Sequence, residues 1–145
     1  MKLSNSRLDA GPPRPWTFAE AQAAVPYLSS VARSLREHYL ARLAKGRDVR
    51  QLTERRGRPD RTALIEEQEA RRDLREAEQD YQDALEELSE LNVQSLDPVG
   101  GLVLVPFVYA DQLAWYVFDL FDSQPIGWWR YQSDPEETRR PLTAP

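Results

Sequence analysis

Apolar residues at helical spacing mark the first long element of the chain. One stripe advances by alternating steps of three and four residues through Phe18, Ala21, Val25, Leu28, Ala32, Leu35 and Tyr39. This period predicts a helix with one buried side. Thr17 and Glu20 fit a capping box at its start, and the helix should end just before Gly46. Pro26 lacks an amide donor, so we expect a kink near Gln22.

A second helical pattern follows a polar segment. Residues 46–59 are rich in arginine and hold two glycines and a proline, which predicts a loop. The next helix should begin near Asp60 or Thr62. Its stripe consists of Ala70, Leu74, Ala77, Tyr81, Ala84, Leu88 and Leu91. Two long helices joined by a loop predict an antiparallel hairpin over residues 17–92.

The pattern changes to a period of two within residues 101–131. The segments LVLVPFVY, LAWYVFDL and IGWWRY are rich in β-branched and aromatic residues and predict three antiparallel strands. Pro106 cannot donate to a ladder, so the first strand should lie at the sheet edge. The segments are apolar at both alternating sets of positions, so both faces of the sheet need cover. Trp128 and Trp129 should lie on opposite faces and differ in burial.

These elements predict an α+β fold in which a long antiparallel helical hairpin packs on a three-stranded antiparallel β-meander. The chain of 145 residues is the size of one ordinary domain, so we expect a single domain over residues 1–145. Residues 1–15 hold three prolines and a glycine without any period and predict an extended tail. Residues 132–145 predict a C-terminal tail.

Four motifs in order along the chain carry a family resemblance. They are TFAEAQAAVPYL at 17–28, GLVLVPF at 101–107, IGWWR at 126–130 and RRPL at 139–142. Together they resemble the small bacterial proteins catalogued as domain of unknown function 2203. The resemblance supports the fold and implies no activity. The chain departs from the family pattern at Arg130, where relatives often have histidine, and at Val105, where they tend to have aspartate. A polar site formed by those positions in relatives would be altered here.

Charge and composition argue against several classes of function. A net charge of −5 disfavours wholesale binding to nucleic acid or membranes, because both require a positive field. The absence of cysteine excludes disulfides, thiolate metal sites and cysteine nucleophiles, and the single His38 excludes a multi-histidine metal site within one chain. No charged segment leads into an apolar stretch at the start, and no run approaches the roughly 18 apolar residues of a membrane span. We therefore expect a cytoplasmic protein.

The aromatic strands hold the candidate ligand or partner face. Its residues are Trp115, Asp119, Trp128, Trp129 and Arg130. Aromatic side chains in such density predict core packing, with a homodimer face or an apolar ligand pocket as the alternative. Asp119 interrupts an apolar strand and, if buried, should need a partner such as Arg130 or Arg139.

The leading hypothesis is a non-catalytic interaction or assembly protein that binds itself or another protein through the helices or the second sheet face. The alternative is a small-molecule or metal-dependent enzyme with a site on the sheet near Asp119, Trp128 and Arg130. The sequence contains no Walker loop, no glycine-rich dinucleotide motif and no serine with a plausible base. It therefore predicts no cofactor and identifies no catalytic residue or metal ligand.

The arginines of the predicted loop form a separate candidate site. Seven cations and three anions between residues 45 and 61 give a local charge of +4. This charge would attract a phosphate-rich partner at low salt, although a solvated connector explains it as well. No aromatic residue lies among these cations, so any contact with nucleic acid should be weak and independent of sequence. The basic loop residues are Arg47, Arg50, Arg55, Arg56 and Arg58.

Overall fold

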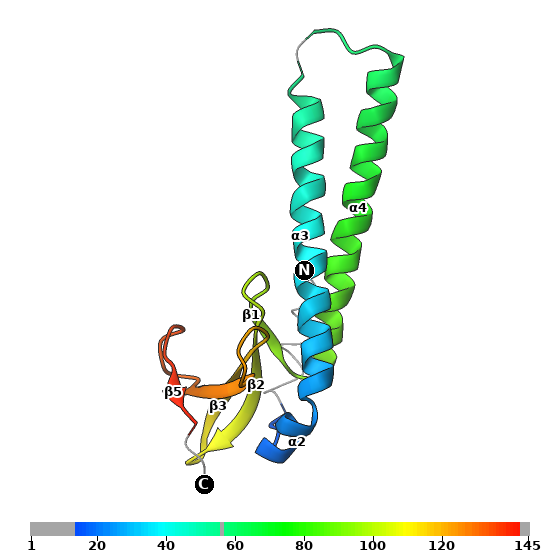
Figure 1. Ribbon diagram of the computed structural model, residues 1–145. Helices are drawn as coiled ribbons and strands as arrows, with labels where there is room; N and C mark the ends of the chain where they lie inside the picture. Colours follow the sequence, from blue (N-terminus) through cyan, green and yellow to red (C-terminus); the bar gives the residue numbers. More distant parts are fainter. Residues whose placement is uncertain (1–13, 56, 143–145) are drawn as a thin grey trace.

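A computed structural model describes residues 14–55 and 57–142 of the chain. A helical part precedes an antiparallel sheet, so the predicted α+β class is confirmed (Figure 1). The greater part of the predicted N-terminal tail and the last residues of the C-terminal tail lie outside these ranges. Within them, no helix combines the length and apolar character that crossing a bilayer requires.

The first predicted helix is divided into α2 (Phe18–Ala23) and α3 (Val25–Thr53). The predicted capping box is present at the start of α2, where Thr17 and Glu20 each accept a hydrogen bond from the other's amide. Pro26 lies in the first turn of α3. Amides in this turn have no hydrogen-bond partner within the helix, so the missing amide hydrogen of proline costs no helical hydrogen bond. The ring prevents the preceding turn from continuing, so the expected kink is a break between two helices.

The end of α3 corrects the predicted loop. The helix continues through Gly46, and the predicted loop at 46–59 shortens to residues 54–60. A glycine inside a helix costs about 1 kcal/mol relative to alanine. Continuing the helix buries Val49 in the seam with the second helix, which favours the longer helix.

Helix α4 (Arg61–Glu90) begins between the two predicted starts, Asp60 and Thr62. Asp60 is its N-cap, and the Asp60 carboxylate accepts the Ala63 amide at 2.7 Å. The two long helices pack antiparallel, as predicted, and their lower end meets the sheet while their upper end extends well beyond it (Figure 1). The buried residues of the two helices are Leu28, Val31, Ala32, Leu35, Val49, Ala77, Ala84 and Leu88.

A cation lies near the middle of the hairpin. The Arg42 guanidinium lies 5.1 Å from the centre of the Tyr39 ring and 5.0 Å from that of Tyr81. The Arg42 Nε is buried and has no hydrogen-bond partner among the described residues. Burial raises the pKa of the Tyr81 hydroxyl, and the nearby Arg42 opposes this rise. The hydroxyl therefore stays neutral at physiological pH, and the contact with Arg42 is a cation–π interaction and not an ion pair.

Within the described residues, the sheet has five antiparallel strands in the order β1-β2-β3-β4-β5. The three predicted strands are present as β2 (Leu102–Tyr109), β3 (Gln112–Asp119) and β4 (Ile126–Tyr131). Two short strands were not predicted, β1 (Gln94–Asp97) and β5 (Arg140–Pro141). The predicted meander therefore matches the three central strands and lacks the short strand at each edge of the sheet.

Strand β2 is not the edge strand that Pro106 predicted. β1 lies beside it but pairs only as far as Leu104. Further along β2, the Pro106 carbonyl accepts a hydrogen bond from the Trp16 amide at 2.8 Å. The nitrogen and carbonyl of one strand residue point to the same side, so the proline nitrogen faces away from β3. No ladder bond is lost, because this stretch of β2 has a local open edge.

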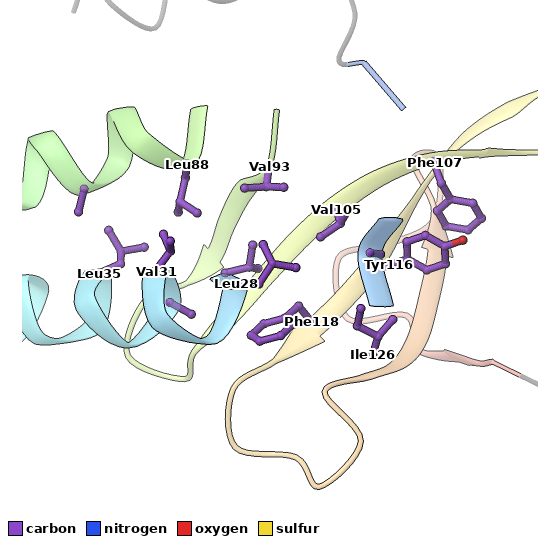
Figure 2. Packing of buried hydrophobic residues seen from close by; sticks show 14 of the residues in the cluster. Leu28, Val31, Leu35, Leu88, Val93, Val105, Phe107, Tyr116, Phe118 and Ile126 are labelled. Atoms are coloured by element: carbon purple, nitrogen blue, oxygen red, sulfur yellow. The ribbon is translucent and has the colours of Figure 1, made fainter. Parts of the chain in front are cut away.

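The main core lies where the lower end of the hairpin meets one face of the sheet, which we call the inner face (Figure 2). Leu28, Val31 and Leu35 of α3 and Leu88 of α4 supply the helical side of this core. The buried strand residues are Val103, Val105, Phe107, Ala114, Tyr116, Phe118 and Ile126.

The turn between β2 and β3 holds two residues in the left-handed region. Ala110 has φ 52° and Asp111 has φ 60°, between the paired residues Tyr109 and Gln112. A two-residue hairpin turn of this hand matches the twist of the strands and requires positive φ at both positions. Alanine is unfavourable there, because its Cβ approaches the following carbonyl.

Replacing Ala110 by asparagine should therefore stabilise the protein. We expect Ala110→Asn to raise the free energy of unfolding by roughly 0.5 kcal/mol, since asparagine tolerates this conformation better. Urea unfolding followed by circular dichroism measures the change. The matched change at exposed, helical Ala19 should instead lower stability. A lower stability for both variants would contradict this account of the turn.

Candidate functional site

The predicted ligand or partner face is divided between the two faces of the sheet. Cross-strand partners share a face, and the register pairs Trp115 with Arg130 and Trp129 with Tyr116. Trp129 therefore lies on the inner face, and the expected separation of the tryptophans is confirmed. The opposite face, which we call the outer face, carries Leu102, Leu104, Trp115, Val117, Asp119, Trp128 and Arg130.

The outer face has a small core of its own. Leu104, Trp115 and Val117 are 4%, 2% and 1% exposed. The Trp115 indole donates a hydrogen bond to the Gln132 side chain. Trp128 lies at the margin and is 37% exposed. The partly buried apolar residues packed on this core in the described part of the chain are Leu96, Leu102 and Leu113.

Arg130 is a buried cation on the outer face. It is 6% exposed, and its Nη1 donates to the carbonyl oxygens of Tyr131 and Asp134, each at 3.3 Å. Its Nε has no hydrogen-bond partner among the described residues. The guanidinium thus holds the turn after β4. Val105 lies on the inner face, so the two departures from the family pattern do not share a site.

Asp119 is only half-buried and caps a turn, so the condition under which an arginine partner was expected is not met. Its Oδ1 accepts the Phe121 amide at 3.0 Å just after β3. Among the described residues, no ion pair joins Asp119 to Arg130 or Arg139. The same ranges hold no group of three or more histidine, aspartate or glutamate side chains placed to bind a metal ion.

The sequence did not reveal a cluster around Arg140, which we call the arginine box. Its walls are Trp129, Tyr131 and Asp134, and Tyr109 packs behind the two rings. The Arg140 Nε and Nη2 donate to the two carboxylate oxygens of Asp134 at 2.8 and 3.0 Å. Its guanidinium lies 5.4 Å from the ring centre of Trp129 and 5.0 Å from that of Tyr131.

Several contacts fix the walls of the arginine box. The Trp129 ring packs edge-on against Tyr109 at 5.2 Å and against Tyr131 at 4.9 Å. The Asp134 carboxylate also accepts the Tyr131 amide at 2.9 Å. The bond from Arg140 holds the pKa of Asp134 below its usual value, so this carboxylate is charged at neutral pH. In the sequence, only the RRPL motif includes a residue of this cluster. Local periodicity does not predict which residues pair across a loop.

The residues of the predicted basic loop are divided between a helix and the connection that follows it. Arg47 and Arg50 lie on α3, while Arg55 and Arg58 lie in the connection, and Arg56 lies outside the described residues. The Arg55 guanidinium pairs with Glu66 at 3.1 Å. Part of the local positive charge is therefore already neutralised.

Comparison with known proteins places the chain in a family. A family model described as "Uncharacterized conserved protein (DUF2203)" matches residues 14–142. Searches of curated proteins and of solved structures give no significant match. Because the family model matches nearly the whole chain, from the segment before α2 to the end of β5, the protein belongs to the DUF2203 family of uncharacterized conserved proteins.

Proposed function

We propose that this protein is a non-catalytic assembly module that binds copies of itself through the projecting hairpin. The observation that carries the proposal is that two opposite sides of this hairpin bear opposite charge. Three features support it, namely sparse packing within the upper hairpin, segregation of charge between the helices, and exposed leucines on the basic side.

The upper hairpin buries few large side chains between its own helices. In α3, Val49 is the buried residue after Leu35. In α4, Ala77 is the buried residue before Tyr81. Four large apolar residues on the same stretch are exposed, namely Leu40, Leu43, Leu64 and Ile65. A two-helix seam of this kind gains little from burial, so packing against a further protein surface would stabilise it.

Charge is segregated between the two helices. α3 has six cations and two anions, a net charge of +4, while α4 has four cations and eleven anions, a net charge of −7. The ion pairs in the described part of the hairpin are Arg55–Glu66 and Arg71–Glu67. Neither uses a cation of α3, and three of that helix's cations, Arg33, Arg47 and Arg50, are exposed to solvent.

The charged stripes lie on opposite sides of the hairpin. The Tyr27 hydroxyl donates to Glu87 at 2.7 Å and so marks one side, and the Arg36 guanidinium donates to the Val99 carbonyl at 2.8 Å and marks the other. Tyr27 and Arg36 are nine residues apart, about two and a half turns, which places them on opposite sides of α3. The basic stripe is Arg36, Leu40, Leu43, Arg47 and Arg50, and the acidic stripe of α4 is Glu69, Glu76, Asp80, Asp83 and Glu87.

The two stripes complement each other but cannot meet within one molecule. The basic stripe of one copy fits the acidic stripe of the next, with exposed Ile65 beside the acids as an apolar contact for Leu40 and Leu43. Such an interface is heterologous, so it produces rings or open stacks rather than a two-fold dimer. A phosphate backbone gives no contact to the leucines, so the stripe favours a protein partner over nucleic acid.

Two variants test this arrangement by sedimentation velocity. We expect wild-type protein to form oligomers larger than dimers that dissociate as salt rises, because exposed charges are screened. Leu40→Ser with Leu43→Ser, and Glu76→Lys with Asp83→Lys, should each give monomers. Their equimolar mixture should give a dimer and nothing larger, since one intact stripe of each kind remains. Arg58→Glu, off both stripes, is the charge control.

The outcomes are distinguishable. Wild-type protein that stays monomeric at low salt would overturn self-assembly. Failure of the mixture to form dimers, with wild-type oligomers intact, would overturn the head-to-tail arrangement. Retention of RNA or DNA at about 50 mM salt, without self-association, would replace the proposal by a nucleic-acid contact.

A further inference from the structure

A short segment of the chain lies along the edge of β4 as a ligand would. The register pairs Trp128 with Pro141 and Trp129 with Arg140, and the Leu142 amide donates to the Gly127 carbonyl at 3.0 Å. Leu142 also packs against the main core. Residues 140–142 are therefore held by backbone pairing, by one charged side chain and by one apolar side chain.

These contacts match the way proteins recognise extended peptides. Addition of a strand to a sheet edge supplies affinity through the backbone, and pockets for individual side chains supply specificity. Here the arginine box takes the place of such a pocket. Asp134 receives the guanidinium in a bidentate pair, and the rings of Trp129 and Tyr131 lie within reach of cation–π attraction. Lysine cannot reproduce the bidentate geometry, so the arginine box selects arginine.

The walls of the box are independent of the segment that occupies it. Tyr109 lies at the end of β2, Trp129 and Tyr131 lie on β4, and Asp134 lies in the turn that follows. Asp134 also accepts the Tyr131 amide, a contact that does not involve Arg140. β5 has two residues, both exposed, and Pro141 has no amide to donate. The walls thus come from the sheet and the turn after β4, whereas the occupant is a short segment held by the side chain of Arg140 and by the amide and side chain of Leu142.

We propose that the β4 edge and the arginine box form a receptor for an extended arginine–proline segment of a partner polypeptide. Residues 140–142 occupy this receptor within the chain and show the sequence that it accepts. The intramolecular segment competes at an effective concentration in the millimolar range, so a partner segment binds once the Arg140 contact is released. This site is separate from the charged stripes of the hairpin and does not depend on the assembly proposed for them.

The test uses the full chain carrying Arg140→Ala and a peptide with the sequence of residues 137–142, ETRRPL, capped at both ends. Trp129 lies in the box, so tryptophan fluorescence reports binding. We expect saturable binding to this variant and at least tenfold weaker binding to wild-type protein, whose own arginine fills the box. A peptide with alanine at the second arginine should bind at least tenfold more weakly. Adding Asp134→Asn to the variant should abolish binding.

Each alternative outcome contradicts the proposal. Equal binding of the two peptides, or undiminished binding after Asp134→Asn, would show that the box does not select arginine. Binding to wild-type protein as tight as to the variant would show that the segment does not occupy the receptor. Circular dichroism checks that Arg140→Ala is folded. If it is not, Arg140→Lys keeps a cation without the bidentate pair and should show the same preference between peptides.

Discussion

Leu35→Asp will abolish cooperative folding of the protein. Leu35 is 1% exposed at the level where both long helices meet the sheet (Figure 2). Loss of a buried leucine costs about 2–5 kcal/mol, and an unpaired carboxylate in the same place costs several more. The sum approaches the whole stability of an ordinary domain, about 5–15 kcal/mol. Circular dichroism and urea unfolding measure the result.

Two matched substitutions on the hairpin serve as controls. Leu74 belongs to the predicted α4 stripe but is only half-buried, so Leu74→Asp should destabilise less than Leu35→Asp. Leu40 is 36% exposed, and Leu40→Asp should change the stability of the monomer by less than about 1 kcal/mol. Equal losses at Leu40 and Leu35 would show that the seam faces a different direction.

Trp115→Ala should lower the free energy of unfolding by about 3–5 kcal/mol. Trp115 is 2% exposed between Leu104 and Val117 on the outer face. Its removal opens a cavity and leaves the Gln132 side chain without the indole donor. Equilibrium unfolding in urea measures the loss as a lower midpoint at an unchanged slope.

The neighbouring Trp128 tests whether the outer face is a true core. It is 37% exposed, so Trp128→Ala should cost far less than Trp115→Ala. Trp115→Phe, which keeps most of the apolar volume, should fall between the two. Equal losses of stability at Trp115 and Trp128 would show that the outer face has no core of its own.

Local patterns predicted the elements that have long, regular periods. The stripes that end at Tyr39 and Leu91 gave the hairpin, and the alternation within residues 102–131 gave the three central strands with nearly correct bounds. The end of the first helix was predicted too early, at Gly46. The low helix propensity of glycine is a local effect of about 1 kcal/mol, whereas burial of Val49 depends on the other helix. β1 and β5 are too short to show a period, and they exist because long neighbouring strands offer them an edge.

The site residues were harder to predict because their roles depend on pairing across the sheet. Alternation correctly separated Trp128 from Trp129. It could not show that Arg130 would donate to carbonyl oxygens of its own turn, or that Asp119 would cap a turn. The arginine box joins Asp134 to Arg140 across a loop and to aromatic rings from two other strands. No periodic pattern in the sequence predicts that these residues come into contact.

The cation in the hairpin seam determines how the two long helices align. If α4 slid by one turn along α3, the guanidinium of Arg42 would leave the Tyr81 ring and face residues that offer no π-surface. A single polar side chain in an apolar seam lowers stability and in return selects one alignment. The register of α4 against α3 is thereby fixed. The contact of Arg42 with the two tyrosines helps to fix how far each charged side chain of α4 lies from those of α3 along the hairpin.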